Sequence, residues 1–439
     1  MRLWSRTSPR GRGKAAARWA AAGADVDGRL SYLRDSAGTF GWLAARAAAQ
    51  AVTVLLLARQ LGPEAYGQLV AALAIGGFLV PVANLGLPGA LVRDLSRRDT
   101  RGGNTSTPEA VGIWICVGPA AAAVAATLAV LVLPGMLAPW AVAALAMGET
   151  LSASGGELLA RIFQGRRRLM RFGQAMFSLP GARAVALGLC AVLDVRAPEA
   201  WVSAYAAAGV LPAVWLVLAE PAAPGRAWRT WRKLARRGRP FALSALAVRL
   251  QGELNKPLLA QLSHASAGQF GLAQRIVDIV LLPFVALMES LLPRVYARAH
   301  DPLQLLRETG APLVILALAA GVGISVGGEW ILGLFGSGYS DTSWMLIALC
   351  AFPAARVATT LGNVALVALG LATYLPRVVW GGGIGGTLAA LALIPWFGAL
   401  GAVAALYVGE LIALAVQLMV LHSSAKGNQK TSAIKRRSG

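Results

Sequence analysis

"LLLARQLGPEAYGQLVAALAIGGFLV", from Leu55 to Val80, decides the fold class because two long apolar runs meet there at a short polar break. Each run is too apolar to bury only one face of a helix in a soluble core. Gly62 and Pro63 are expected to end one helix, and the next begins near Gly67. The segment therefore predicts a tight hairpin between two antiparallel membrane helices, and apolar runs of about 20 residues recur along the whole chain.

The composition supports a polytopic membrane protein. Hydrophobic residues make up 56% of the 439 residues and charged residues only 14%, whereas soluble domains carry roughly 25% charged residues. A transmembrane β-barrel would alternate apolar and polar residues in segments of about ten, and the sequence does not. We predict an all-α protein with about twelve transmembrane helices. The expected spans are 38–58, 67–88, 110–133, 138–160, 172–193, 199–219, 241–262, 268–293, 308–333, 342–367, 376–395 and 398–422.

The cysteines and histidines give no support for a disulfide or a metal site. Cys116, Cys190 and Cys350 all fall inside apolar runs, where cysteine is typical as a small core residue. The three histidines are far apart in the sequence. We therefore predict no metal ligands, and no cofactor.

The basic residues predict the orientation of the chain. The net charge of +21 could indicate a nucleic-acid partner, but its distribution argues otherwise. With the N-terminus in the cytoplasm, the inner segments carry 33 Lys and Arg residues, and the outer loops carry only Arg59 and Arg196. Because cytoplasmic loops are enriched in Lys and Arg, both termini are expected in the cytoplasm, with the chain in the cytoplasmic (inner) membrane and no nucleic acid bound.

The polar segments divide the chain. The termini are basic and poor in large apolar residues, which is typical of disorder. In the linker, Trp228, Trp231 and Leu234 are spaced to share a helix face, so a helix on the anionic inner leaflet is expected, the alternative being a solvated linker. The predicted domains are a cytoplasmic tail 1–37, an N-lobe 38–219, a cytoplasmic amphipathic linker 220–240, a C-lobe 241–422 and a cytoplasmic tail 423–439.

The two lobes contain an internal repeat. Shifting the sequence by 201 residues pairs 44–93 with 245–294, with eleven identities in fifty positions. Some identities are expected by chance in a chain rich in Ala and Leu, but the glycine pair Gly67 and Gly268 is less easily explained in that way. An even number of spans separates the two copies, so they run in the same direction. Parallel repeats of this kind are a transporter layout.

Three segments of the sequence resemble the bacterial polysaccharide biosynthesis flippases. The first, 56–97, contains A-R-x-L-G-P-x-x-Y-G followed by Asn84-Leu-Gly-Leu, where the family usually has aspartate. The second, 254–298, ends on an L-P-R motif at 292–294, and the third, 331–370, contains L-F-G-x-x-Y. The family belongs to the multidrug, oligosaccharidyl-lipid and polysaccharide exporter superfamily.

The resemblance implies a fold and a cargo. The expected fold is a V-shaped transporter of two six-helix lobes that works by alternating access. The implied cargo is a polyprenyl-pyrophosphate-linked oligosaccharide, moved from the inner to the outer leaflet, with a polysaccharide polymerase and glycosyltransferases as further partners. The peptidoglycan lipid-precursor flippase and the multidrug and toxin exporters belong to the same superfamily, and the shared fold does not choose among them.

Ionisable residues within the spans are the candidate site residues, because a charge at bilayer depth costs roughly 2.5–3.5 kcal/mol on insertion scales. An anionic pyrophosphate needs cations to cross the membrane, and the planar guanidinium suits phosphate oxygens. The predicted substrate-binding cations are Arg46, Arg249, Arg275, Arg183, Arg356 and Lys256. The predicted ion-coupling residues are Glu149, Glu253, Asp278 and Glu410.

Structural pairing is the alternative for several of these charges. Arg249 with Glu253, and Arg275 with Asp278, have the spacing of intrahelical ion pairs. Lys256 could instead extend to the membrane surface. Glu157 is expected to pair with Arg161, because the two residues lie one helical turn apart.

Other functions are less consistent with the sequence. A cation-coupled drug exporter would not need so many basic residues in its spans. A membrane glycan polymerase or ligase needs a large external loop with catalytic residues, and all the expected outer loops are short. The sequence contains no P-loop, so ATP hydrolysis is not expected. We predict a transporter with no catalytic residues.

Overall fold

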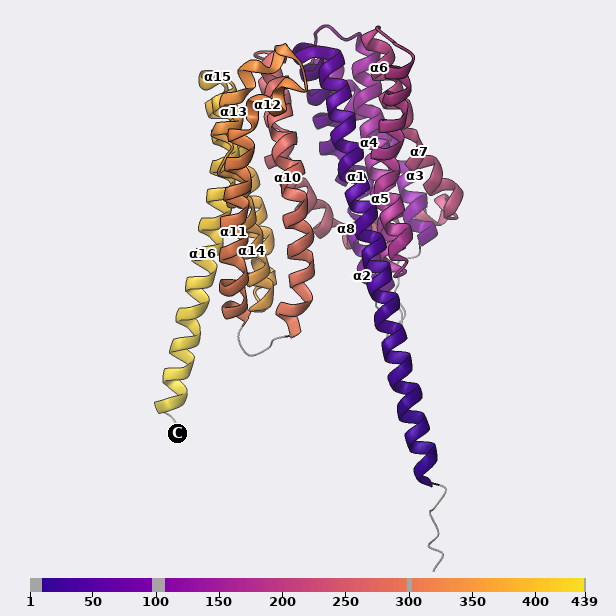
Figure 1. Cartoon of the computed structure of the whole chain (residues 1–439), viewed down its shortest axis with the longest axis vertical. Coiled ribbons are helices and arrows are strands. Elements are labelled where there is room, and N and C mark those ends of the chain that lie inside the picture. Colours follow the sequence, from indigo (N-terminus) through magenta and orange to yellow (C-terminus); the bar gives the residue numbers. More distant parts are fainter. Residues whose placement is uncertain (1–9, 97–106, 298–301, 438–439) are drawn as a thin grey trace, which may run out of the picture.

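A computed structural model describes residues 10–96, 107–297 and 302–437, and these residues form helices without any strand (Figure 1). The predicted basic loops around 97–106 and 298–301 lie outside the described residues. The α-helices are α1 (Arg10–Ala83), α2 (Leu87–Ser96), α3 (Thr107–Val132), α4 (Pro139–Gly165), α5 (Leu169–Val192), α6 (Pro198–Ala208), α7 (Val210–Ala219), α8 (Pro224–Glu253), α9 (Asn255–Ala260), α10 (His264–Ala297), α11 (Pro302–Val326), α12 (Gly328–Gly333), α13 (Ser343–Ala348), α14 (Phe352–Ala368), α15 (Leu375–Phe397) and α16 (Ala399–Arg437). Two short 3-10 helices are η1 (Ser337–Thr342) and η2 (Ala372–Tyr374).

The opening hairpin lies inside α1. Its helix is interrupted at Gly62, which has φ 70° and ψ 173°, a conformation that glycine adopts without the steric penalty of a Cβ atom. Pro63 follows and suits the first turn of the next helix, because proline has no N–H to leave unpaired. The break predicted at "GPEAYG" is therefore present, and α1 contains two apolar helices.

The apolar helices are long enough to cross a bilayer. By length and composition, 6 helical segments of the described chain qualify, or 7 if the bent pair Ser337–Ala348 and Phe352–Ala368 counts as one span. One of the 6, Gly41–Ala83, contains both arms of the hairpin. The protein is a multi-pass membrane protein, and the expected number of about twelve spans stays a prediction.

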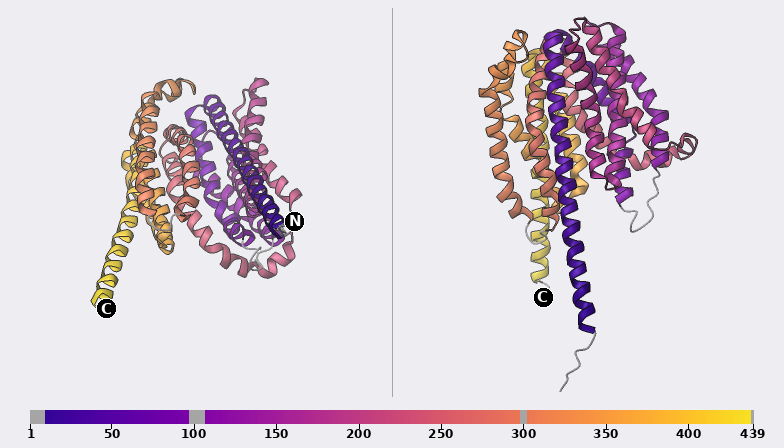
Figure 2. Two further views of the ribbon diagram at one scale, coloured as in Figure 1. Left: turned by 60° about the horizontal axis from the view of Figure 1, so that its bottom comes forward. Right: turned by 45° about the vertical axis from the view of Figure 1, so that its right-hand side comes forward.

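The helices form two bundles (Figure 1). Helices α1–α7 make one bundle, which we call the N-lobe, and α9–α16 make the other, the C-lobe. Figure 2 shows α8 passing from the N-lobe to the C-lobe as one long helix. The structure also continues α1 from Arg10 and α16 to Arg437, where the composition favours disorder; the alanine-rich N-terminal segment has high helix propensity.

The lobes touch at one end, through residues that the repeat makes equivalent. A Cβ atom on Gly67 would lie 1.8 Å from the carbonyl oxygen of His264, and one on Gly268 would lie 2.0 Å from the carbonyl oxygen of Pro63. Pro63 and His264 are equivalent positions of the repeat, as are Gly67 and Gly268. The contact of Gly67 with His264 is therefore equivalent to the contact of Gly268 with Pro63. This reciprocity places an approximate two-fold axis between Gly67 and Gly268.

Hydrogen bonds between the lobes reinforce the same end. The Tyr339 hydroxyl donates to the Ala58 carbonyl at 3.1 Å. The Gln261 amide donates to the carbonyl of Val132, and His264 Nε2 lies 2.8 Å from the carbonyl oxygen of Pro134. This end is therefore closed.

Candidate functional site

A cavity of about 450 Å³ lies between the lobes, lined by α1, α4, α5 and α6 from one side and by α8, α9 and α10 from the other. Most of the residues predicted from charge alone line it. They are Arg46, Arg183, Arg249, Lys256 and Arg275, with Glu149, Glu253 and Asp278. Arg356 and Glu410 do not line this cavity; they lie inside the C-lobe.

Arg275 on α10 is the cavity cation with the fewest local partners. It makes no ion pair with any residue that the structure describes, and the same holds for Asp278 one turn later. The expected alternative, an intrahelical ion pair between the two, does not form. Glu253 and Asp278 still lie near enough to stabilise the charge of Arg275 electrostatically. What Arg275 offers an anionic ligand in the cavity is therefore its hydrogen-bond donors, which no described residue occupies.

Arg46 on α1 lines the same cavity as Arg275 and has no carboxylate partner of its own among the described residues. Its Nη1 lies 3.9 Å from the sulfur of Met176, a weak contact, and its Nε is buried with no hydrogen-bond acceptor. Buried polar atoms in proteins are mostly hydrogen-bonded. An acceptor supplied by a ligand would satisfy this guanidinium.

Glu253 pairs with two cations at the junction of α8 and α9, so the three side chains together keep one positive charge. Its carboxylate lies 3.6 Å from Arg249 Nη1 and 2.6 Å from Lys256 Nζ. The Arg249 pair is the intrahelical alternative expected from spacing, and it does form. Lys256 does not extend to the membrane surface, because its side chain is only 4% exposed and its ammonium group is held by Glu253.

Arg183 on α5 is held by residues from two other helices. Its Nη2 lies 2.7 Å from Glu149 Oε2 on α4, and its guanidinium stacks on the ring of Tyr205, 3.9 Å from the centroid. The Ser152 hydroxyl lies 3.4 Å from the same nitrogen. Arg183 Nε remains buried without an acceptor, so this cation is fixed in place with part of its donor capacity unused.

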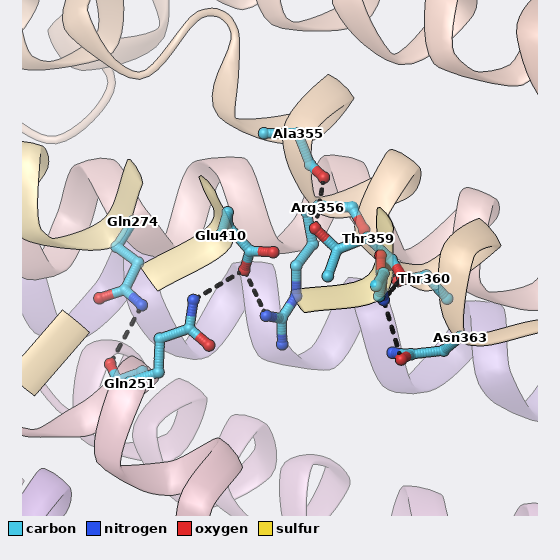
Figure 3. A network of polar contacts seen from close by, with 10 residues as sticks. Gln251, Gln274, Ala355, Arg356, Thr359, Thr360, Asn363 and Glu410 are labelled. Carbon is cyan, nitrogen blue, oxygen red and sulfur yellow. Dashed lines mark hydrogen bonds and ion pairs between the residues drawn. The ribbon is translucent and has the colours of Figure 1, made fainter. Parts of the chain in front are cut away.

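A second ion pair between different helices, after that of Arg183 with Glu149, lies in the C-lobe (Figure 3). Arg356 Nη1 on α14 lies 2.5 Å from Glu410 Oε1 on α16, and Gln251 from α8 donates to the same oxygen at 2.9 Å. The carboxylate is 1% exposed, and its other oxygen has no hydrogen-bond donor among the described residues. Together with Gln251, the pair therefore joins three helices rather than lining the cavity.

Two cavity residues pair differently from the sequence-based expectation. Arg161 donates to Gln164 Oε1 at 2.7 Å instead of pairing with Glu157. Glu157 accepts a hydrogen bond from Asn84 at 3.4 Å. Asn84 is the position where the resembled family usually has aspartate, and an aspartate there would face a second carboxylate. The Asn84 amide can instead donate a hydrogen bond to the Glu157 carboxylate.

Sequence reasoning missed the aromatic part of the site. Tyr66 and Tyr205 line the cavity, and no charge pattern singles them out. The only signal was a hydroxyl-bearing ring inside an apolar span. Tyr205 gives Arg183 a cation–π contact, which strengthens as water is excluded.

The cavity lining is positive overall. It includes six basic and four acidic side chains, so the formal balance is +2 when all are ionised. The volume falls in the range of about 300–1,000 Å³ typical of small-molecule pockets. The geometry suits the anionic head of a ligand better than a cationic one, and it has the layout of a transporter cavity between paired bundles.

Comparisons with known proteins agree with this fold. The sequence profile of the family described as "Polysaccharide biosynthesis protein" matches residues 40–296. No curated protein matches the sequence. A lipid II flippase, MurJ, in an inward closed conformation is similar in structure, with a TM-score of 0.68, 12% identity and coverage of 89% of this chain and 87% of that one. An inward-facing MATE multidrug transporter has a TM-score of 0.66, 15% identity and coverage of 90% and 96%.

These findings define the class and the family. Over about 90% of its length, the chain has the fold of a lipid II flippase and of a multidrug transporter of the MOP superfamily. The chain belongs to the polysaccharide biosynthesis protein family.

Proposed function

We propose that the protein flips a polyprenyl-pyrophosphate-linked oligosaccharide from the inner to the outer leaflet of the cytoplasmic membrane. The observation that carries this proposal is the positive cavity, and above all Arg275, a cavity cation without a contact ion pair in the described chain. A pyrophosphate is strongly disfavoured in hydrocarbon unless cations pair with it. The polyprenyl tail remains in lipid while the head occupies the cavity.

The proposed orientation places both termini in the cytoplasm, in agreement with the positive-inside rule. The closed contacts at Gly67 and Gly268 then form the outer gate, and the structure represents a state closed to the outside. Transport requires these contacts to separate while the other end closes. Acidic residues are the candidates for coupling this change to an ion, with Glu149, Glu253 and Asp278 at the cavity and Glu410 in the C-lobe.

A direct test is translocation of a fluorescent polyprenyl-pyrophosphate oligosaccharide in proteoliposomes. We expect Arg275→Gln to abolish translocation at unchanged protein incorporation. The matched control is Arg59→Gln, which removes an exposed arginine outside the cavity. Wild-type translocation by Arg275→Gln would contradict the assignment of the cavity.

A second set of substrates in the same assay distinguishes among the cargo classes of the superfamily. The same proteoliposomes would be offered a peptidoglycan lipid precursor, which shares the pyrophosphate, and a cationic dye. We expect the pyrophosphate lipids to be translocated. The lipid that is translocated faster shows which sugar headgroup the protein prefers. Movement of the dye alone would instead assign the protein to the drug exporters.

A further inference from the structure

A second hollow of about 450 Å³ lies outside the central cavity, between the end of α1 and the middle of α8. We call it the α8 groove. Its walls are apolar: Pro81, Val82 and Leu85 on one side and Leu243 and Leu246 on the other. It shares no lining residue with the central cavity.

Three arginines border the α8 groove. Arg232, Arg236 and Arg239 follow one another at i, i+4 and i+7, so they share one face of α8. All three are exposed, and none has a carboxylate partner in the parts of the chain that the structure describes. Arg237, by contrast, points toward the N-lobe and lies 3.8 Å from Asp94.

The backbone of α8 packs closely against the N-lobe, so the three arginines project from a helix whose position is fixed. A Cβ atom on Gly238 would lie 1.9 Å from the carbonyl oxygen of Leu85, and one on Gly86 would lie 2.4 Å from that of Gly238. Leu234 is 1% exposed in the N-lobe core. Because the backbone of this helix is ordered before binding, only the arginine side chains lose conformational entropy when a ligand arrives.

Two tryptophans indicate that this part of α8 lies at the membrane interface. Trp228 and Trp231 are 65% and 43% exposed, and tryptophan is enriched where the hydrocarbon meets the headgroups. The sequence predicted that Leu234 shares their face, whereas it packs inward because three-residue steps drift around a helix with 3.6 residues per turn. The exposed face therefore combines aromatic rings with arginines.

We propose that the α8 groove binds an anionic glycerophospholipid of the cytoplasmic leaflet. The arginine row pairs with the phosphodiester, and the apolar walls cover the first part of the acyl chains. A soluble phosphate would leave the apolar walls without a partner. The assignment to this leaflet rests on the orientation proposed above, while the site itself does not depend on which cargo the central cavity carries.

The test is native mass spectrometry of the full-length protein in detergent, titrated with phosphatidylglycerol. We expect the R232Q/R236Q/R239Q variant to bind its tightest lipid at least about tenfold more weakly, since each basic residue near an anionic headgroup contributes to binding. The matched control, R226Q/R229Q/K233Q, removes the same charge from exposed positions of α8 outside the groove and is expected to bind as the wild type does.

A second variant separates shape from charge. Val82→Trp fills the groove without altering its charge and is expected to expel the lipid. Equal weakening in the control triple, or equally tight binding of phosphatidylcholine, would overturn the site. Displacement of phosphatidylglycerol by an equimolar polyprenyl phosphate would also overturn it, because the groove would then belong to the cargo lipid. Translocation of the cargo is measured separately, so failure here leaves the proposed flippase activity intact.

Discussion

Two ion pairs of similar geometry have very different surroundings. In the N-lobe, Arg183 and Glu149 join α5 to α4 at 2.7 Å, with side chains 7% and 17% exposed beside the central cavity. In the C-lobe, Arg356 and Glu410 join α14 to α16 at 2.5 Å, with the arginine 40% and the carboxylate 1% exposed. Both pairs connect two different helices, but only the first lines the cavity.

The difference teaches that an intramembrane charge acquires its role from what surrounds the pair. Arg183 stacks on Tyr205, and its unpaired Nε is buried, so what it presents to the cavity is its positive charge, held in place by Glu149. Glu410 is buried and bound by both Arg356 and Gln251. The C-lobe pair therefore holds helices together, and the N-lobe pair both holds helices together and lines the central cavity.

The largest expected effect is on stability, at the C-lobe pair. Arg356→Met leaves the Glu410 carboxylate buried without its cation, which costs about 3 kcal/mol of unfolding free energy. Thermal unfolding in detergent measures this loss. The double variant Arg356→Met/Glu410→Leu is expected to recover most of it. If the double variant were as unstable as the single one, the loss would not come from the stranded carboxylate.

The next effect is on transport, at the N-lobe pair. Arg183→Gln is expected to reduce translocation at least about tenfold, equivalent to 1.4 kcal/mol of lost stabilisation, because a cavity cation is removed. Arg356→Lys, which keeps a positive charge beside Glu410, serves as the comparison and is expected to transport at near the wild-type rate. Equal losses in the two variants would erase the functional distinction between the lobes.

Substitutions on the two sides of the contact between the lobes should have equal effects, in contrast to substitutions in the two ion pairs. Gly67→Ala and Gly268→Ala each introduce a Cβ atom into a backbone contact, and overpacking of this kind costs about 1–3 kcal/mol. Because the contacts are reciprocal, we expect equal decreases in melting temperature. Gly225→Ala, where a Cβ atom meets nothing within 4 Å, is the control. Strongly unequal decreases would argue against the two-fold axis.

The smallest effect is expected for an exposed pair. Arg196 and Asp194 lie 2.9 Å apart with side chains 85% and 78% exposed. Exposed ion pairs contribute little, so Arg196→Gln is expected to change the unfolding free energy by less than about 0.5 kcal/mol. A larger change in the melting temperature would show that ion-pair distance, rather than burial, governs these contributions.

Local signals predicted much of the helix layout. The hairpin at Gly62 follows from a glycine and a proline between apolar runs, and the repeat identified the glycines that later prove to meet. Predictions for segments with weaker signals were less accurate. Leu234 packs inward instead of sharing the exposed face of the two tryptophans, and the tails continue as helix where disorder was expected. The linker and the following span form one helix, α8, through Pro240, although a boundary there was expected at the end of the basic segment.

The sequence by itself determined the solvent of this protein, since only lipid can surround so many helices that are apolar on all sides, and it named the charges that must be accommodated there. Only the tertiary structure decided their partners. Glu149 and Arg183 are 34 residues apart, and Arg356 and Glu410 are 54 apart, so no helical period connects them. Hydropathy depends on each residue alone, whereas an ion pair across helices depends on how the lobes pack, and that packing separates the cavity cations from the structural ones.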